Sequence, residues 1–160
     1  MKLYLDSSTI VKRYVKEPGT STMDFIFDQA ENGELVVTFS MWNVGEVLGV
    51  LDERRRRGWL SEEEYMVTLK ILSSELLKLL RLRVLEIFPV LVSSLIETWG
   101  IVLNYHVYEA DALQITTYRY TKSDVLLSSD EKLIKVSRSL GLKVFDIVKE
   151  EQELLTFIKT

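Results

Sequence analysis

Four acidic residues occupy positions in the chain where a carboxylate could do chemistry: Asp6, Glu46, Asp111 and Asp130. Asp6 follows the short apolar run 2–5, and Asp130 comes shortly after the run 125–127. Both runs predict buried strands, so these two acids lie at or just beyond strand ends. Because ligands of open α/β sheets bind beyond the carboxyl ends of the strands, we expect the two acids to share one edge of a sheet.

The other two acids lie near the starts of predicted helices. Glu46 lies in a helix at 41–56 among apolar residues rather than in a charged stripe, which is typical of a solvated edge or of a site. Asp111 lies between Ala110 and Ala112 in a helix at 108–120. Alanines on both sides allow close approach of another backbone, but they are also simply good helix formers.

Two of the acids stand beside serines that have a structural explanation as helix caps. Ser7 and Ser8 can cap a helix at 9–15, and Asp6 is not needed for that role. The cluster Ser128-Ser129-Asp130 can cap a helix at 131–140. We therefore expect Asp6 to be present for a reason other than capping.

Four converging carboxylates predict an oxygen-donor site for a hard cation, Mg²⁺ or Mn²⁺. Two such cations roughly 3.5–4 Å apart would keep the acids ionised and hold both oxygens of an in-line phosphoryl displacement. The chain has no Cys and a single His, at position 106, which excludes thiolate chemistry and nearly rules out Ser/His/Asp triads and His-rich zinc sites. The favoured reaction is phosphodiester hydrolysis by a metal-activated water.

Composition and charge limit the class of protein. The chain has 160 residues, is 47% hydrophobic and is poor in Pro and Gly, which predicts one globular domain over 1–160. No apolar run is long enough to span a bilayer and no signal peptide opens the chain, so we expect a soluble cytoplasmic protein. The net charge of −4 argues against nucleic-acid binding by bulk electrostatics.

One dense cationic run could still contact nucleic acid locally. Residues 54–57 are all arginine and end the helix at 41–56. Cations at a helix C-terminus interact favourably with the helix dipole without any ligand, and we favour this interpretation. The alternative is a phosphate-contacting patch that uses Arg54 and Arg55.

Apolar runs and helical periodicities alternate along the chain, which predicts a parallel sheet of about five strands sandwiched between α-helices. The long helix at 61–83 has apolar residues on more than one face, so it is buried between two neighbours or forms a subunit interface of a homodimer. The expected strands are 2–5, 35–39, 84–88, 125–127 and 143–145, and the expected helices are 9–15, 20–32, 41–56, 61–83, 90–99, 108–120, 131–140 and a terminal helix from 149.

With these motifs in order, the sequence resembles the PIN-domain ribonucleases over nearly its whole length. The resemblance rests on Leu3-Tyr4-Leu5-Asp6-Ser7-Ser8, on Ser40 followed by Glu46, on Ala110-Asp111-Ala112-Leu113, and on Leu127-Ser128-Ser129-Asp130 followed by Gly141-Leu142-Lys143-Val144. The size and layout are similar to VapC-type toxins of toxin–antitoxin pairs. This implies a Mg²⁺- or Mn²⁺-dependent endoribonuclease, frequent homodimers and a cognate antitoxin that blocks the site.

The resemblance also implies roles for individual residues. Asp6 and Asp111 match the central metal ligands, Glu46 matches a ligand or a residue that orients the metal through water, and Asp130 matches the acid that serves a second metal or its water. Ser7 and Ser129 match supporting hydroxyl positions. Where many members carry a further acid or Asn after the fourth acid, this chain has Glu131 and then Lys132.

Two rival interpretations differ from a nuclease. A phosphatase of the haloacid-dehalogenase type needs a second Asp two residues after the first, and Ser8 stands there. A catalytically degenerate PIN module that acts as an RNA-binding or assembly scaffold is the stronger rival, although the presence of all four acids argues against it. Metal-dependent cleavage of single-stranded RNA, with and without EDTA, separates the nuclease from the scaffold.

Overall fold

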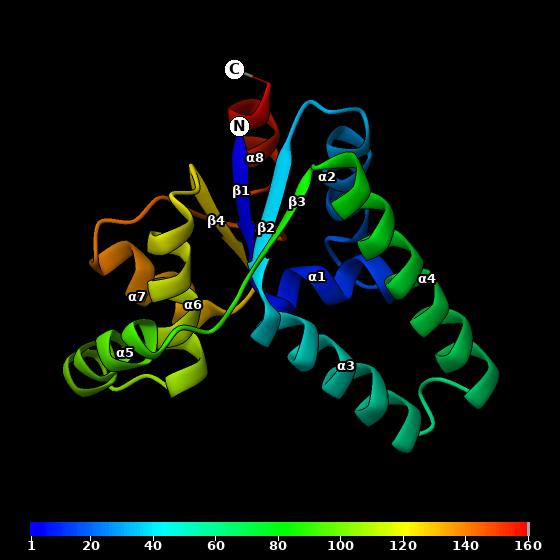
Figure 1. Ribbon diagram of the computed structural model, residues 1–160, viewed down its shortest axis with the longest axis horizontal. Coiled ribbons are helices and arrows are strands. Elements are labelled where there is room, and N and C mark those ends of the chain that lie inside the picture. The colour runs from blue at the N-terminus through cyan, green and yellow to red at the C-terminus, as the bar shows by residue number, and fades with distance from the viewer. Residues whose placement is uncertain (160) are drawn as a thin grey trace.

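The computed structural model describes residues 1–159 and is built on a five-stranded sheet in the order β3-β2-β1-β4-β5 (Figure 1). All neighbouring strands are parallel, which confirms the predicted α/β class. The central strand β1 lies deep in the core, since Leu3, Tyr4 and Leu5 are fully inaccessible to solvent. The strands are β1 (Lys2–Leu5), β2 (Val36–Ser40), β3 (Leu85–Phe88), β4 (Val125–Ser128) and β5 (Val144–Asp146).

Helices cover both faces of the sheet, because each strand-to-strand crossover carries at least one of them (Figure 1). Side chains alternate along β1: Leu3 and Leu5 join the larger core cluster, and Tyr4 joins the core on the opposite face. The helices are α1 (Ser7–Tyr14), α2 (Thr20–Glu31), α3 (Met41–Arg56), α4 (Glu62–Leu82), α5 (Val92–Tyr105), α6 (Glu109–Thr121), α7 (Glu131–Ser139) and α8 (Glu151–Ile158).

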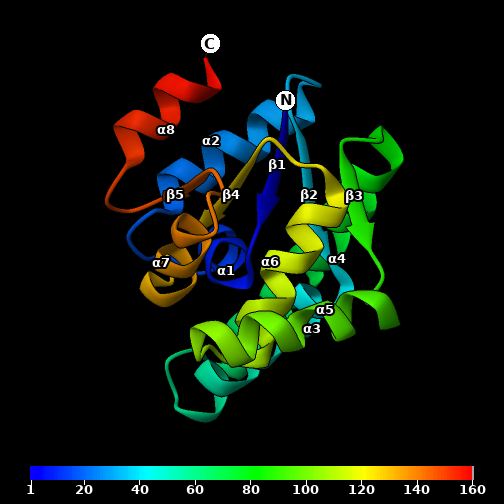
Figure 2. The same ribbon diagram turned by 90° about the vertical axis from the view of Figure 1, so that its left-hand side faces the viewer.

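The larger core lies between the sheet and a layer made of α1 to α4 and α8, and the smaller cores lie under α5, α6 and α7. Figure 2 shows α8 beside α2, where the hydroxyl of Thr22 donates a hydrogen bond to Glu151. Among the described residues 1–159, no helix combines the length and the apolar character needed to cross a bilayer.

Several predicted boundaries follow from local capping. Ser40 and Ser61 each accept a hydrogen bond from the third residue of the following helix, whose side chain bonds back to the serine, as in a capping box. The long predicted helix is present as α4, within one residue of the predicted limits at each end. Its buried residues Leu72 and Leu79 belong to the larger core.

The helix predicted at 90–99 is present, but its predicted end at Gly100 was wrong. Helix α5 runs from Val92 to Tyr105 and ends at His106, which adopts a left-handed conformation with φ 53°. Glycine inside a helix weakens it by only about 1 kcal/mol relative to alanine. Burial of Ile101 next to Gly100 against the smaller core offsets such a cost, so the helix continues.

Candidate active site

The sheet brings the four predicted acids to the carboxyl ends of its strands. Asp6 directly follows β1, and Asp130 follows β4, the neighbour of β1 in the sheet. Glu46 lies in the second turn of α3, which begins where β2 ends, and Asp111 lies in the first turn of α6. Four separate elements therefore direct carboxylates to one edge of the sheet.

The charges of these acids act on one another. The pKa of Asp6 is raised to about 6, chiefly by burial and also by the negative charge of Asp130, while the hydrogen bonds that Asp6 accepts oppose the increase. Burial also raises the pKa of Asp111, and Asp130 and Glu46 add to this effect while the cation of Lys132 opposes it. Mutual repulsion between acids that share a site is the physical cause of these added shifts.

Asp6 is the most constrained of the four acids, with 3% of its surface exposed. Its Oδ1 atom accepts hydrogen bonds from the Thr9 backbone N–H at 2.9 Å and from the Ser8 hydroxyl at 2.7 Å. Its Oδ2 atom accepts one from the Ser128 hydroxyl at 2.7 Å. Asp6 is itself the N-cap of α1, which corrects the expectation that Ser7 and Ser8 perform this role. The helix follows β1 with no intervening loop, so the capping position falls on the acid.

The serines near the site are arranged in a chain of hydrogen bonds. Ser8 and Ser128 bond the Asp6 carboxylate directly, whereas the Ser129 hydroxyl and backbone N–H contact the oxygen of Ser8. Ser129 thus supports Asp6 through Ser8, and Ser7 opens α1 next to the carboxylate. Ser8 and Ser128 were not among the predicted site residues, although both stand beside predicted ones in the sequence.

A buried polar network behind Glu46 was also missed by the sequence analysis. The Nε2 atom of Gln114 donates a hydrogen bond to Glu46 Oε2 at 3.0 Å, while Gln114 Oε1 accepts from the Tyr4 hydroxyl and from Asn43 Nδ2, each at 2.8 Å. Tyr4, Asn43 and Gln114 are all buried. The available signal was the position of Gln114, three residues after Asp111 and so on the same face of a helix.

With this geometry established, the fold can be compared with known proteins. No protein-family model matches the sequence, and no curated protein matches it. Solved structures do match: PAE2754 from Pyrobaculum aerophilum has a TM-score of 0.68 at 12% identity, covering 99% of this chain and 90% of that chain. VapC20 from Mycobacterium tuberculosis, described as a sarcin–ricin loop cleaving toxin, has a TM-score of 0.61 at 14% identity over 88% of this chain and 95% of its own. VapBC2 from Rickettsia felis, solved bound to a DNA fragment from its promoter, has a TM-score of 0.61 at 16% identity over 91% and 98% of the two chains.

The chain has a PIN-like fold. The identities are low, so the likeness concerns the arrangement of the backbone. The chemistry of the site therefore has to be inferred from the residues of this chain at the strand ends.

The donor set of this PIN-like protein fits a hard cation. All four acids are oxygen donors, and the positive charge of a cation would relieve the repulsion that raises the pKa of Asp6 and of Asp111. Within residues 1–159, however, no three His, Cys, Asp or Glu side chains already stand in an arrangement that could hold a metal ion. Closing the site around a cation would require side-chain rotation. Glu46 and Asp111 are partly exposed, and Asp130 is exposed but caps α7 through Oδ1, which accepts from the backbone N–H groups of Lys132 and Leu133.

The arginine run at the end of α3 is held by acids of the protein. Arg54 pairs with Glu17 at 2.5 Å, and Arg55 pairs with Asp52 at 2.8 Å and with Glu62 at 3.1 Å. Arg56 and Arg57 pair with acids one turn earlier in the helix. These ion pairs favour the interpretation of the run as a helix end over that of a phosphate-contacting patch.

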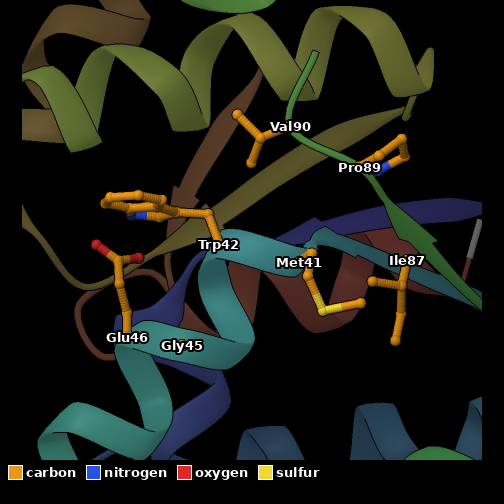
Figure 3. Close-up of a pocket in the computed structure, with 7 residues that line it drawn as sticks. All are labelled: Met41, Trp42, Gly45, Glu46, Ile87, Pro89 and Val90. Carbon is orange, nitrogen blue, oxygen red and sulfur yellow. The ribbon is translucent and has the colours of Figure 1, made fainter.

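An open, mostly apolar pocket of about 710 Å³ adjoins Glu46. Figure 3 shows the Trp42 ring and the Glu46 carboxylate on the same side of α3, with Met41 pointing toward Ile87. The walls come from the first two turns of α3, from β3 and from the segment that follows β3. The lining residues are Met41, Trp42, Gly45, Glu46, Ile87, Pro89 and Val90.

Proposed function

We propose that this protein is a Mg²⁺- or Mn²⁺-dependent endoribonuclease that hydrolyses RNA phosphodiesters. One observation carries the proposal: acids from four elements lie at the carboxyl edge of a PIN-like sheet, close enough for their negative charges to act on one another. Such a group of like charges is a burden on the fold unless a ligand uses it. The absence of Cys and the single His leave oxygen-donor chemistry as the best fit.

In this proposal, Asp6 and Asp111 hold the principal cation, Glu46 binds or orients it through water, and Asp130 serves a second cation or its water. A bound Mg²⁺ or Mn²⁺ supplies charge neutralisation at the phosphate and a nucleophile at neutral pH. The protein contributes positioning, since Ser8 and Ser128 fix the Asp6 carboxylate and Gln114 fixes one oxygen of Glu46. Buried hydrogen-bond partners of this kind hold a ligating side chain in one orientation.

The proposal is tested by cleavage of single-stranded RNA in Mg²⁺, in Mn²⁺ and in EDTA. We expect cleavage with either cation, none in EDTA, and loss of cleavage in Asp111→Asn. Asp28→Asn is the matched control, because Asp28 is an exposed acid on α2 outside the site. Cleavage that persists in EDTA, or in Asp111→Asn at the wild-type rate, would contradict the proposal.

A degenerate scaffold is the alternative function, and it predicts RNA binding without cleavage under every metal condition. The retention of all four acids at one edge of the sheet favours the nuclease over this alternative.

We further propose that the enzyme is the toxin of a toxin–antitoxin pair and forms a homodimer. The toxin role is supported by the likeness to VapC20, described as a toxin, and to VapBC2. Expression of the wild-type chain in a bacterial host should arrest growth, Asp111→Asn should not, and co-expression of an antitoxin encoded beside the toxin should restore growth. Equal toxicity of the wild type and of Asp111→Asn would contradict the toxin role.

A further inference from the structure

We infer that the pocket beside Glu46 binds a nucleobase of single-stranded RNA, stacked on the ring of Trp42. This inference rests on the proposed function, because it assigns a place to a base that flanks the phosphate at the four acids. The stacked base would supply affinity for RNA at a site whose own charges repel phosphate.

Trp42 lies close to one of the four acids, Glu46. Trp42 and Glu46 are four residues apart in α3, so they share one face of the helix and are separated by about 6 Å along its axis. Trp42 is 46% exposed although it lines a pocket whose other walls, apart from Glu46, are apolar. A strand that presents a phosphate to the acids therefore brings a neighbouring base within reach of the ring (Figure 3).

The walls of the pocket have the chemistry that a nucleobase requires. Base–aromatic stacking needs a flat exposed ring, which Trp42 supplies, and Val90 and Pro89 offer apolar surface opposite the helix. The single charged group in the lining is Glu46. Its Oε2 atom accepts from Gln114, while its Oε1 atom has no hydrogen-bond partner within residues 1–159. An acceptor there matches the N–H donors on the edges of bases and disfavours a phosphate in the pocket itself.

Gly45 keeps the pocket open, because it has no side chain to fill it. The residue lines the pocket, and an added Cβ atom would meet nothing within 4 Å. Its φ is not positive, so the backbone does not require glycine here. Glycine weakens the interior of a helix, and alanine would otherwise be the more stable residue at this position.

An apolar peptide is the rival occupant. Strand β3 is an edge strand and ends before Pro89, which has no N–H, so a peptide cannot continue strand pairing past this point. The pocket also carries one acceptor side chain rather than the row of paired groups that a peptide backbone needs. These features favour a nucleobase.

The stacking is tested by fluorescence in a protein whose only tryptophan is Trp42, made by Trp59→Phe and Trp99→Phe. Short single-stranded oligoribonucleotides are titrated in EDTA, so that no cleavage occurs. We expect saturable quenching by base-bearing oligonucleotides and much less by an oligonucleotide with abasic residues. A protein that keeps only Trp59, which is 64% exposed and lies outside the pocket lining, is the matched control and should not be quenched.

The pocket itself is tested by a pair of glycine variants. Gly45→Leu fills the pocket, whereas Gly49→Leu adds the same side chain one turn later, also into open space and outside the lining. RNA affinity, measured by anisotropy in EDTA, should fall by roughly 5- to 150-fold in Gly45→Leu and in Trp42→Ala, the range that loss of one stacked base gives. Gly49→Leu should bind as the wild type does. Thermal unfolding verifies that each variant folds.

The outcomes distinguish this inference from the proposed function. If the wild type cleaves RNA, and Trp42→Ala and Gly45→Leu bind RNA as tightly as it does, the nucleobase pocket is wrong and the nuclease stands. A pocket that serves a protein partner gives this same unchanged RNA affinity and overturns the inference. If the wild type neither binds nor cleaves RNA, both are wrong.

Discussion

Gln114 donates a hydrogen bond of 3.0 Å from Nε2 to Glu46 Oε2, and the direction of this bond is fixed by the backbone. The N–H of Ser40 can only donate, and it bonds Asn43 Oδ1 at 2.8 Å. Asn43 must therefore turn its Nδ2 toward Gln114, whose Oε1 accepts both this group and the Tyr4 hydroxyl. The NH2 group of the Gln114 amide is thus turned toward Glu46, to which it donates one N–H.

Gln114→Glu should make cleavage depend on pH in a new way. The introduced carboxylate, when ionised, cannot donate to Glu46 and repels it, whereas its protonated form restores a donor, so the ratio of variant to wild-type kcat should rise as pH falls. Removing a residue that orients a ligating side chain lowers activity by about 10- to 100-fold, and Gln114→Met should show such a loss at every pH. The measurement is kcat and KM between about pH 5.5 and 8.5, a range that brackets the titration of a buried carboxyl group.

The exposed Gln152→Glu is the control for this series and should leave the pH profile unchanged. A ratio that does not vary with pH for Gln114→Glu, in a protein that unfolds like the wild type, would show that Gln114 does not position Glu46.

Much of the fold could be predicted because local chemistry and tertiary structure agree. The run ending at Leu5 is a buried strand, and Ser40 and Ser61 cap the helices that begin directly after them. The predicted helix end at Gly100 was wrong, because burial of the neighbouring Ile101 in the core outweighs the tendency of glycine to end a helix.

The candidate site was predicted less completely than the fold. The acids could be found because each stands at a recognisable place relative to a strand or helix. Their partners could not, because the bond from Ser128 to Asp6 spans 122 residues and the bond from Gln114 to Glu46 spans 68. A polar residue inside a helix has no visible partner until the sheet order sets α3 and α6 beside each other.

Asp6→Asn should stabilise the metal-free protein at neutral pH. The pKa of Asp6 is raised from 3.8 to about 6 in the folded state, so the folded protein binds the proton more tightly than the unfolded chain does. The destabilisation is absent below pH 3.8, grows as pH rises, and is complete above about pH 6. Two pKa units correspond to at most about 3 kcal/mol, and we expect a gain of about 1–3 kcal/mol at about pH 7.5 that disappears near pH 4.

Urea unfolding in EDTA at the two pH values measures this difference. Asp6→Ala provides the contrast, because it removes the N-cap of α1 as well as the charge and should forfeit about 1 kcal/mol of the gain. An Asp6→Asn variant less stable than the wild type at the higher pH would mean that the hydrogen bonds of Asp6 outweigh its burial.

Arg54→Ala with Arg55→Ala should leave RNA binding unchanged. Both guanidinium groups are paired with acids of the protein, so few counterions are released from them when RNA binds. Affinity in Ca²⁺ at two salt concentrations should give the wild-type salt dependence, while stability falls only slightly, because exposed ion pairs contribute little. A flatter salt dependence in the double variant would restore the run to the RNA-binding surface.

Ile96→Glu with Leu103→Glu should convert the proposed homodimer into a monomer. The sequence analysis assigned the interface to the long helix, but Leu72 and Leu79 of α4 are buried in the core, and Leu76 packs against it, so part of its apolar excess is explained by burial. Helix α5 presents a stripe at spacings of four, three and four residues that is more than half exposed, made of Val92, Ile96, Trp99 and Leu103. This spacing is that of one helix face packed against another helix.

Light scattering at micromolar concentration measures the change. An unpaired carboxylate buried in an interface is destabilising by about 3 kcal/mol or more, so the dimer should weaken by at least about 100-fold. The matched pair on α4 is Ile71→Glu with Leu77→Glu, two residues that are also more than half exposed. If the α4 pair gives a monomer and the α5 pair does not, the interface lies on the long helix, and a wild-type monomer would refute the dimer on either helix.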